Sequence, residues 1–362
     1  MKVGLITGGR WHNEPYLYLK KKGIEIILFD DSDNCFIKEE YNHKNYKLKN
    51  IKNFKNIPFW SPCNDFGSVL SDYYNKVNQT KTKLRSIKSN SKNFDKKNFS
   101  KPSNTSIKFK YKKYLLKPRF GSGSKDIKFW NGKKFDKKKL YLEEYFRGFE
   151  LSVEVISNAN KHKIFAVSLR VVKKIKSAIA LLSFDHSKKF KIFIQDVIEN
   201  HLKKHKVVNG VSHIELILNN KLESKIIDTN LRCPGAGLTE YFYFLLTNKN
   251  LFEIDFKILF KISKKLTSAN NSKNGIILFD HSFLNNFKKK ISSLSKNLVY
   301  YNLASQMRTN KLDNELDINR KGLAVKSFKS KKELLYFCEK IFKKKDLSKI
   351  SNFFNFYNEN FN

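Results

Sequence analysis

The sequence has little cysteine and no closely spaced cysteine pair. Its 362 residues contain four cysteines, Cys35, Cys63, Cys233 and Cys338. None forms a CxxC pair or a Cys/His cluster with zinc spacing. A disulfide framework and a structural zinc site are therefore not expected.

Long apolar runs are also missing. No run approaches the ~18–20 residues that cross a bilayer; the longest, such as 177–184 and 241–246, have the length of a strand or a short helix. The N-terminal MKVGLITGGR lacks the apolar core of a secretory signal. Hydrophobic residues still make up 40% of the chain and aromatic residues 14%, too much for a disordered protein. The sequence predicts a folded cytoplasmic protein of two or three domains without a membrane span.

Acidic residues are scarce relative to basic ones. Lys and Arg number 72 and Asp and Glu 33, which gives a net charge of +39. A charge of this size raises nucleic acid as a partner. Most of the basic residues are Lys, spread along the chain among abundant Asn, Ile and Phe, so we interpret the charge as a solvated surface and disfavour nucleic acid. The arginines are more informative, because a planar guanidinium is harder to replace; Arg119, Arg147, Arg170 and Arg232 lie in or beside the segments described next.

The dinucleotide-binding fingerprint GxGxxG is absent from the N-terminal segment, which disfavours a nicotinamide site. Residues 3–7 and 24–30 have the pattern of buried strands, and 14–22 that of a helix, so we expect a small parallel sheet. From about 77 to 110 the sequence turns to Lys, Asn, Ser and Thr, which indicates a domain boundary. The further expected elements are strands at 114–118, 140–156, 163–171, 211–218 and 225–231 and a helix at about 189–206.

Small residues follow a strand in the segment 113–127, KYLLKPRFGSGSKDI. Backbone amides of Gly121, Ser122, Gly123 and Ser124 could approach phosphate oxygens closely. The Walker pattern GxxxxGK[ST] is absent. Taken alone, the segment is equally compatible with a flexible hairpin turn.

An acidic pair and several aromatic residues precede a strand in the segment 141–156, YLEEYFRGFELSVEVI. Such a segment could form the edge of an adenine site, with backbone groups reading the base and a carboxylate reading the ribose hydroxyls. An ordinary amphipathic strand with exposed acids explains the same pattern.

The segment 210–237, GVSHIELILNNKLESKIIDTNLRCPGAG, is the most specific. Alternation places His213 and Glu215 on one face of a strand, and Asp228 and Asn230, with Arg232 after them, on one face of the next. A turn at 219–221 makes the two strands a hairpin. Two carboxylates and an amide oxygen are suitable ligands for Mg²⁺. A solvated strand face with an acid–arginine pair is the alternative.

In this order, the three segments resemble the ATP-grasp superfamily, and in particular its carboxylate–amine ligases. The resemblance covers roughly residues 1–262 and implies a mixed α/β and α+β fold, with a Rossmann-like N-terminal domain followed by a two-subdomain ATP-grasp fold. We divide the chain into that first domain (1–80), the ATP-grasp domain (81–262) and a C-terminal α/β extension (263–362). The GxxHxE pattern at 210–215 is similar to that of ligases that join amino acids.

The resemblance also assigns roles to residues. It implies nucleotide binding by Lys117, by the loop of Gly121, Ser122, Gly123, Ser124 and Lys125, by the hinge of Glu143, Glu144 and Phe146, and by Glu150 at the ribose. It implies metal binding by Glu215, Asp228 and Asn230, and catalytic roles for Arg232 and Lys125. Lys92 is a candidate for an earlier phosphate-binding lysine, and Arg170 and His213 for the acceptor site, although a structural hydrogen bond is the favoured role of His213.

The implied activity is an ATP-dependent ligation of a small-molecule carboxylate and an amine through an acyl phosphate, with ATP and Mg²⁺ as cofactors. Mn²⁺ and a homo-oligomer are left open. Asp228 stands where the family usually has Glu, and Asp126 where Gly is common, which leaves the integrity of the site open. The alternatives are a polyanion-binding protein with an inactive ATP-grasp fold, and an enzyme of the carbamoyl-phosphate or carboxylase type.

Overall fold

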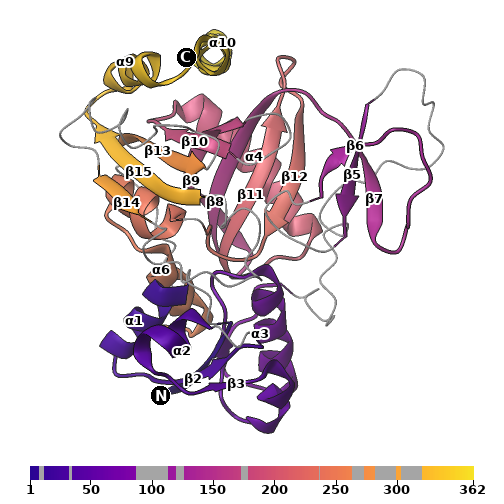
Figure 1. Cartoon of the computed structure of the whole chain (residues 1–362), viewed down its shortest axis with the longest axis vertical. Helices are drawn as coiled ribbons and strands as arrows, with labels where there is room; N and C mark the ends of the chain where they lie inside the picture. The colour runs from indigo at the N-terminus through magenta and orange to yellow at the C-terminus, as the bar shows by residue number, and fades with distance from the viewer. Residues whose placement is uncertain are drawn as a thin grey trace.

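The described residues of the computed structural model form three β-sheets, flanked by helices (Figure 1). No helix among the described residues is long and apolar enough to cross a membrane. The described residues are 1–7, 12–31, 35–86, 113–119, 126–172, 178–235, 237–262, 273–281, 299–302 and 320–362.

The N-terminal part forms a four-stranded sheet in the order β3-β2-β1-β4, with parallel pairing throughout. Four of the five residues of the central strand β1 are buried, as its apolar sequence requires. The predicted parallel sheet is confirmed. Its elements are β1 (Lys2–Ile6), α1 (Asn13–Lys21), β2 (Glu25–Phe29), α2 (Phe36–Tyr41), β3 (Asn45–Tyr46), the 3₁₀-helix η2 (Leu48–Asn53), β4 (Phe59–Trp60) and α3 (Asp65–Val77).

A large antiparallel sheet forms the body of the molecule, in the order β12-β11-β8-β9-β10-β13-β15-β14. Its strands are β8 (Phe149–Asn158), β9 (Lys161–Val172), β10 (Ala178–Ser183), β11 (Gly210–Leu218), β12 (Ser224–Asn230), β13 (Asn274–His281), β14 (Val299–Asn302) and β15 (Arg320–Phe328). The accompanying helices are α4 (Lys188–Lys204), the π-helix η4 (Leu238–Tyr243), α5 (Phe244–Thr247), α6 (Leu251–Leu259), α9 (Lys331–Ile341) and α10 (Lys344–Phe361).

A small third sheet, β6-β5-β7, lies beside β12 at the right of Figure 1. Its strands are β5 (Tyr114–Pro118), β6 (Lys128–Phe129) and β7 (Leu140–Glu144). Together, the small and large sheets give the two-subdomain arrangement that the sequence predicts. The predicted boundary at 262 falls between α6 and β13, and β13 joins the same sheet as β8 to β12; the division into domains stays a prediction.

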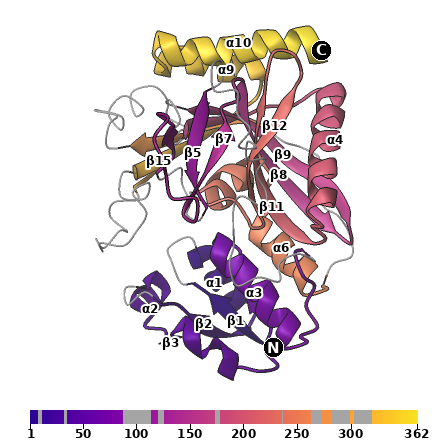
Figure 2. The same ribbon diagram turned by 90° about the vertical axis from the view of Figure 1, so that its right-hand side faces the viewer.

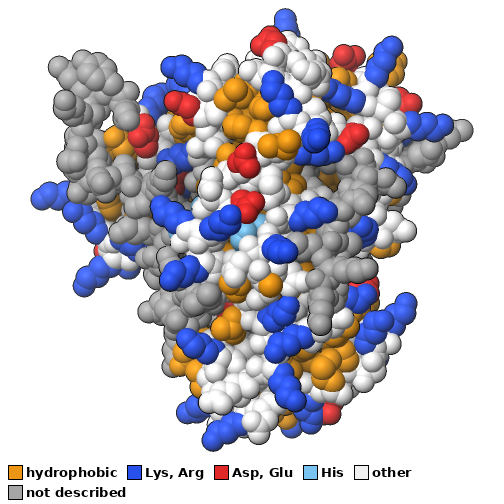
Figure 3. Space-filling view, turned by 180° about the vertical axis from the view of Figure 1, so that it is seen from behind, with side chains coloured by type: hydrophobic (Ala, Val, Ile, Leu, Met, Phe, Trp, Pro, Cys, Tyr) orange, Lys and Arg blue, Asp and Glu red, His pale blue; other side chains and the backbone are white. Residues whose placement is uncertain are grey.

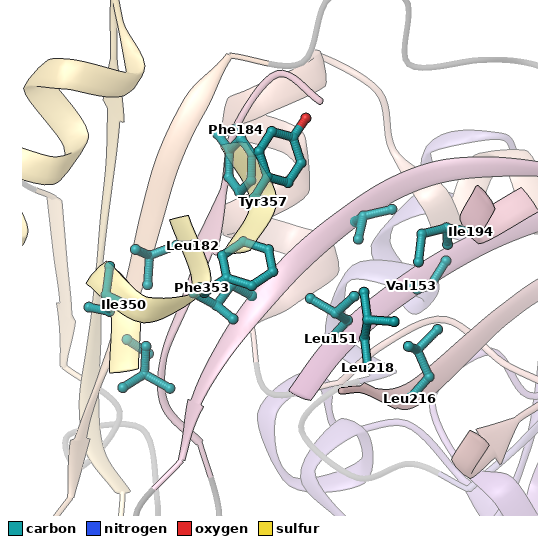
Figure 4. Packing of buried hydrophobic residues seen from close by; sticks show 14 of the residues in the cluster. Leu151, Val153, Leu182, Phe184, Ile194, Leu216, Leu218, Ile350, Phe353 and Tyr357 are labelled. Carbon is teal, nitrogen blue, oxygen red and sulfur yellow. The ribbon is translucent and has the colours of Figure 1, made fainter. Parts of the chain in front are cut away.

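One face of the large sheet is apolar and covered by helices. Leu151 and Val153 of β8 pack with Ile194 of α4 and with Ile350 and Phe353 of α10 (Figure 4). Figure 2 shows α4 alongside the sheet and α10 across one end of it. Because side chains alternate along a strand, the residues between these apolar ones point to the other face. That second face is free of the helices α4 and α10 and holds the polar residues described below.

A buried ion pair connects the N-terminal sheet to the large sheet. The Asp255 carboxylate of α6 accepts two hydrogen bonds from the Arg85 guanidinium, both at 2.6 Å, and one each from Trp60 Nε1 and the Val211 amide, both at 2.8 Å. Gly210 has a φ of 90° here, and a Cβ on it would lie 2.7 Å from Arg85 Nη1. We refer to Trp60, Arg85, Val211 and Asp255 as the interdomain hub.

Candidate active site

The hairpin of β11 and β12 brings the predicted metal ligands together. Glu215 lies opposite Asp228, and His213 lies opposite Asn230. Cross-strand partners in an antiparallel pair project to the same face. The hairpin and the convergence of the two acids are therefore as the sequence predicts, while the binding of a metal there stays a prediction.

The oxygen atoms of this hairpin fit a magnesium ion chemically. Asn230 Nδ2 donates a hydrogen bond to Asp228 Oδ2 at 3.2 Å, whereas Asn230 Oδ1 is buried without a hydrogen-bond partner. A buried amide oxygen without a partner is costly unless a cation or donor meets it. No group of three or more His, Cys, Asp or Glu side chains with metal-site geometry occurs in the described part of the chain. Mg²⁺ commonly takes only one or two carboxylates and completes its shell with water and phosphate oxygens.

Arg170 of β9 lies beside the same acids. Its Nη1 forms an ion pair with Glu215 Oε1, and its Nε lies 3.9 Å from Glu150 Oε2. Burial raises the pKa of Glu150, although the positive charges of Arg170, Lys117 and Lys349 act in the opposite direction. Glu150, predicted to bind the ribose, and Glu215, predicted to bind the metal, therefore both lie beside the guanidinium of Arg170.

His213 is held by a buried carboxylate on the neighbouring strand. Its Nδ1 lies 2.9 Å from Glu154 Oε1, and its Nε2 lies 3.4 Å from Glu215 Oε1. Glu154 is fully buried and directly opposite His213 in the sheet. The structural hydrogen bond expected of His213 is present, and its partner is a residue for which the sequence predicted no role.

Lys117 and Glu143 form a buried pair within the small sheet, and Lys117 also reaches β12 of the large sheet. Lys117 Nζ donates to Glu143 Oε1 at 3.0 Å and to the Ile227 carbonyl at 3.2 Å. Lys225 of β12 lies 3.7 Å from Glu143 Oε1 and donates to the Glu144 carbonyl at 2.6 Å. Burial lowers the pKa of Lys225, with the charge of Glu143 opposing. Glu143 Oε2 is buried without a hydrogen-bond partner, which leaves an acceptor at the segment predicted to read adenine.

The remaining predicted nucleotide contacts are only partly described. Phe146 is half-buried in the stretch between β7 and β8. Lys92, Gly121, Ser122, Gly123, Ser124 and Lys125 lie outside the described residues.

Arg232 follows β12 and contacts the N-terminal domain. Its Nε donates to Asp65 Oδ1 at 2.5 Å and its Nη1 to the Cys233 carbonyl at 2.8 Å. The Cys233 amide donates to the Pro62 carbonyl at 2.9 Å. Burial opposes the charged form of Arg232, but Asp65 outweighs it, and the charge of Asp228 adds to the raised pKa. The start of α3 therefore fixes Arg232, for which the resemblance implies a catalytic role; that role stays a prediction.

Four residues at the site were not predicted: Asp65, Glu154, Lys225 and Tyr243, whose hydroxyl donates a hydrogen bond to Glu154 Oε1 at 2.9 Å. The segment 149–158 does carry a signal for Glu154, since Glu150, Ser152 and Glu154 alternate with Leu151 and Val153. Nothing local distinguishes Asp65, which acts through a residue far along the chain.

Lys and Arg side chains are scattered over the face seen in Figure 3 rather than gathered into one patch. A nucleic-acid site typically concentrates its positive charge on one face or stripe. On the described part of this face the positive charge is spread out, and the interpretation that nucleic acid is not a partner stays a prediction.

Comparison with known proteins identifies the fold. A family model of the ATP-grasp domain matches residues 86–236. The chain is similar to a carboxyaminoimidazole ribonucleotide synthase from Aspergillus clavatus crystallised with ATP, with 11% identity and a TM-score of 0.68 over 97% of this chain and 98% of that one. It is also similar to an L-amino acid ligase from Bacillus licheniformis, with 10% identity and a TM-score of 0.65 over 94% and 96% of the two chains. No curated protein sequence matches it.

Proposed function

Because residues 86–236 match a model of the ATP-grasp domain and the fold is similar to that of ATP-dependent enzymes of this kind, we propose that the chain is an ATP-dependent ligase that joins a carboxylate to an amine. A substrate carboxylate attacks the γ-phosphorus of ATP, and the γ-phosphoryl group moves to it as ADP leaves. The amine then attacks the carbonyl carbon of this acyl phosphate, loses a proton and releases phosphate. The product is an amide.

The residues of the site are suited to the charges that develop on oxygen. Lys117 and Arg232 provide fixed positive charge, and the acceptors at Glu143 and the Glu144 carbonyl lie where adenine would bind. Glu215, Asp228 and Asn230 would hold Mg²⁺, which screens the charges of the phosphate oxygens when bound. Catalysis in such a site is mainly positioning and electrostatic stabilisation.

One observation carries the proposal. Glu215 and Asp228 are paired across the hairpin, and the oxygen of Asn230 beside them is buried without a partner. A structural polar face would have satisfied that oxygen within the protein. An oxygen that lacks a protein partner, next to two carboxylates, is best explained by a cation.

The test measures the release of ADP and phosphate from ATP with pairs of acids and amines in the presence of Mg²⁺. Release that requires all three of ATP, an acid and an amine would support the ligase. Glu215→Ala should abolish this release, and wild-type turnover in that variant would contradict the metal assignment. Far-UV circular dichroism of the variant checks that the fold is intact.

Bicarbonate belongs in the same screen. The similarity to a carboxyaminoimidazole ribonucleotide synthase extends over 97% of this chain. If bicarbonate alone supports amine-dependent ADP release, the enzyme is of the carboxylase type. Salt-sensitive binding of nucleic acid without nucleotide turnover would instead favour a polyanion-binding protein.

A further inference from the structure

Arg170 is a largely buried cation between two acids to which the resemblance assigns separate roles. Glu150, Arg170 and Glu215 lie on β8, β9 and β11, and β8 is the strand between the other two. Nη1 of the guanidinium is paired with Glu215 Oε1, and Nε lies 3.9 Å from Glu150 Oε2. The Arg170 side chain therefore crosses over β8.

The register of the three strands defines the path of this side chain. Ser152 of β8 lies opposite Glu215 of β11 on one side and opposite Ser168 of β9 on the other. Arg170 follows Ser168 by two residues, so both project to the same face of the sheet. Neighbouring strands are ~4.8 Å apart, and Arg170 reaches across two such spacings to Glu215. The path passes between Glu150 and Ser152, where a serine side chain adds little bulk.

One donor of Arg170 has no acceptor within the protein. Nε is buried and has no hydrogen-bond partner among the described residues, since 3.9 Å to Glu150 is too long for a hydrogen bond. The whole side chain is only 10% exposed. A buried donor on a charged group is costly unless an acceptor meets it. Guanidinium groups bind phosphate oxygens particularly well, so a phosphate is a suitable acceptor.

The positions of the two acids indicate which phosphate of a nucleotide would come close. In the proposed function, Glu150 binds the ribose and Glu215 binds the metal, which contacts the β- and γ-phosphates. The α-phosphate connects the ribose to these two phosphates. It would therefore lie between the two acids, and Arg170 lies there as well.

We propose that Arg170 is a nucleotide-binding residue that donates a hydrogen bond from Nε to the α-phosphate of ATP. The inference rests on the proposed function, because it requires a nucleotide that extends from Glu150 to Glu215. It replaces the acceptor-site role for which Arg170 is a candidate on sequence grounds.

The test compares AMP with adenosine, which differ only in the α-phosphate. Affinities are measured by ligand-observed NMR in EDTA, so that no metal contributes. The wild-type protein should bind AMP more tightly than adenosine by about tenfold or more, the size expected for a hydrogen bond between charged groups. Arg170→Met should reduce this preference about tenfold and leave the affinity for adenosine unchanged. An unchanged preference in the variant would overturn the proposal, and an equal loss of affinity for both ligands would show a merely structural role and overturn it too.

Two further variants separate the contact from the effects of charge and of folding. Lys163→Met removes an exposed positive charge from the same strand, β9, and should keep the preference for AMP. A loss as large as in Arg170→Met would show a general effect of charge and overturn the contact. Arg170→Lys keeps a cation beside Glu150 and Glu215, and is the variant to use if Arg170→Met does not fold. Lysine has no Nε–H and no planar fork, so most of the preference should still be lost, and full retention would overturn the assignment to Nε.

Binding of ADP with Mg²⁺ distinguishes a failure of this inference from a failure of the proposed function. We expect its Kd to rise about tenfold in Arg170→Met. Equal binding by the wild-type protein and this variant would overturn the inference and leave the proposed function standing. A wild-type protein that binds neither AMP nor ADP would overturn both.

Discussion

Two buried groups of ionic side chains in this protein differ in how many of their hydrogen-bonding atoms have a partner. In the interdomain hub, the Asp255 carboxylate accepts four hydrogen bonds, two of them from Arg85, and Arg85 Nε is the one polar side-chain atom of the pair without a partner. At the candidate site, Glu143 Oε2 of the small sheet and Asn230 Oδ1 on the polar face of the large sheet are both buried without a hydrogen-bond partner. Both groups hold charge inside the protein, but only the second leaves acceptors unused.

The difference separates a structural role from a binding role. A carboxylate that is fully paired with protein donors has no capacity left for a ligand. Unused acceptors are retained at a cost in stability, and that cost is recovered when a ligand binds. The hub should therefore govern whether the two sheets stay together, and the polar face whether the molecule turns over substrate.

Removing the charge of Asp255 should have the largest effect. Asp255→Ala leaves the buried guanidinium of Arg85 uncompensated, and breaking a buried pair in this way costs ~3–5 kcal/mol. Urea unfolding followed by tryptophan fluorescence measures the loss, and Trp60 in the hub serves as a local probe. Glu253→Gln, which removes an exposed pair with Lys257 on the same helix, is the control and should cost ~0.5 kcal/mol or less. Similar losses in both variants would contradict the role given to the hub.

Asp228→Asn should lower activity and leave stability nearly unchanged, in contrast to Asp255→Ala. The substitution keeps the size of the side chain but removes a charge from the predicted metal site. We expect ADP release to fall by ~10²–10³, with an unfolding midpoint in urea close to that of the wild-type protein. An Asp228→Asn protein that is strongly destabilised would assign this acid to the structural class instead.

The buried His186 should make the helix-covered core sensitive to acid. Burial lowers its pKa to about 4, while an unfolded chain takes up the proton near its ordinary value of 6.5. As pH falls from 6.5 towards 4, protonation therefore favours the unfolded state, by roughly 3 kcal/mol once pH is below 4. His186→Gln keeps a donor for the Val167 carbonyl, which His186 Nε2 meets at 3.1 Å, and should remove this part of the pH dependence. Identical slopes of stability against pH in the two proteins would refute the assignment.

Asp65→Asn should have the smallest effect of the four. It weakens the charge-assisted hydrogen bond to Arg232 Nε but keeps an acceptor in place. Such a bond is worth ~1.5–3 kcal/mol, and the neutral acceptor should retain part of it, so we expect ADP release to slow about tenfold. A rate equal to that of the wild-type enzyme would show that Arg232 is held without help from the N-terminal domain.

The local part of the site could be predicted from the sequence. Alternation of side chains within 210–232 and one turn suffice to place Glu215 beside Asp228, because a hairpin is a short-range structure. The alternating strand 149–158 and the helix at α4 were predictable for the same reason. The N-terminal parallel sheet followed from its apolar runs.

The contacts between distant segments could not be predicted. Arg85 and Asp255 are 170 positions apart, and Asp65 and Arg232 are 167 apart. No periodicity connects such pairs, since they meet only after three sheets have packed. Arg170 was predicted near the acceptor site, but its ion pair with Glu215 depends on the strand order β11-β8-β9. Whether a particular oxygen, such as Asn230 Oδ1, finds a hydrogen-bond donor likewise depends on the packed structure, so the sequence could not predict it.

The packing of Phe353 of α10 against Phe149 of β8, with ring centroids 5.3 Å apart, has a consequence for the newly made chain. The ribosome completes β8 long before it reaches residues 344–361, and at ~5–20 residues per second the delay is on the order of ten seconds or more. During this interval, the apolar face that α10 will cover is exposed to other nascent chains. Recruitment of a chaperone to ribosomes that carry this unfinished polypeptide should therefore cease once the segment of α10 has left the exit tunnel.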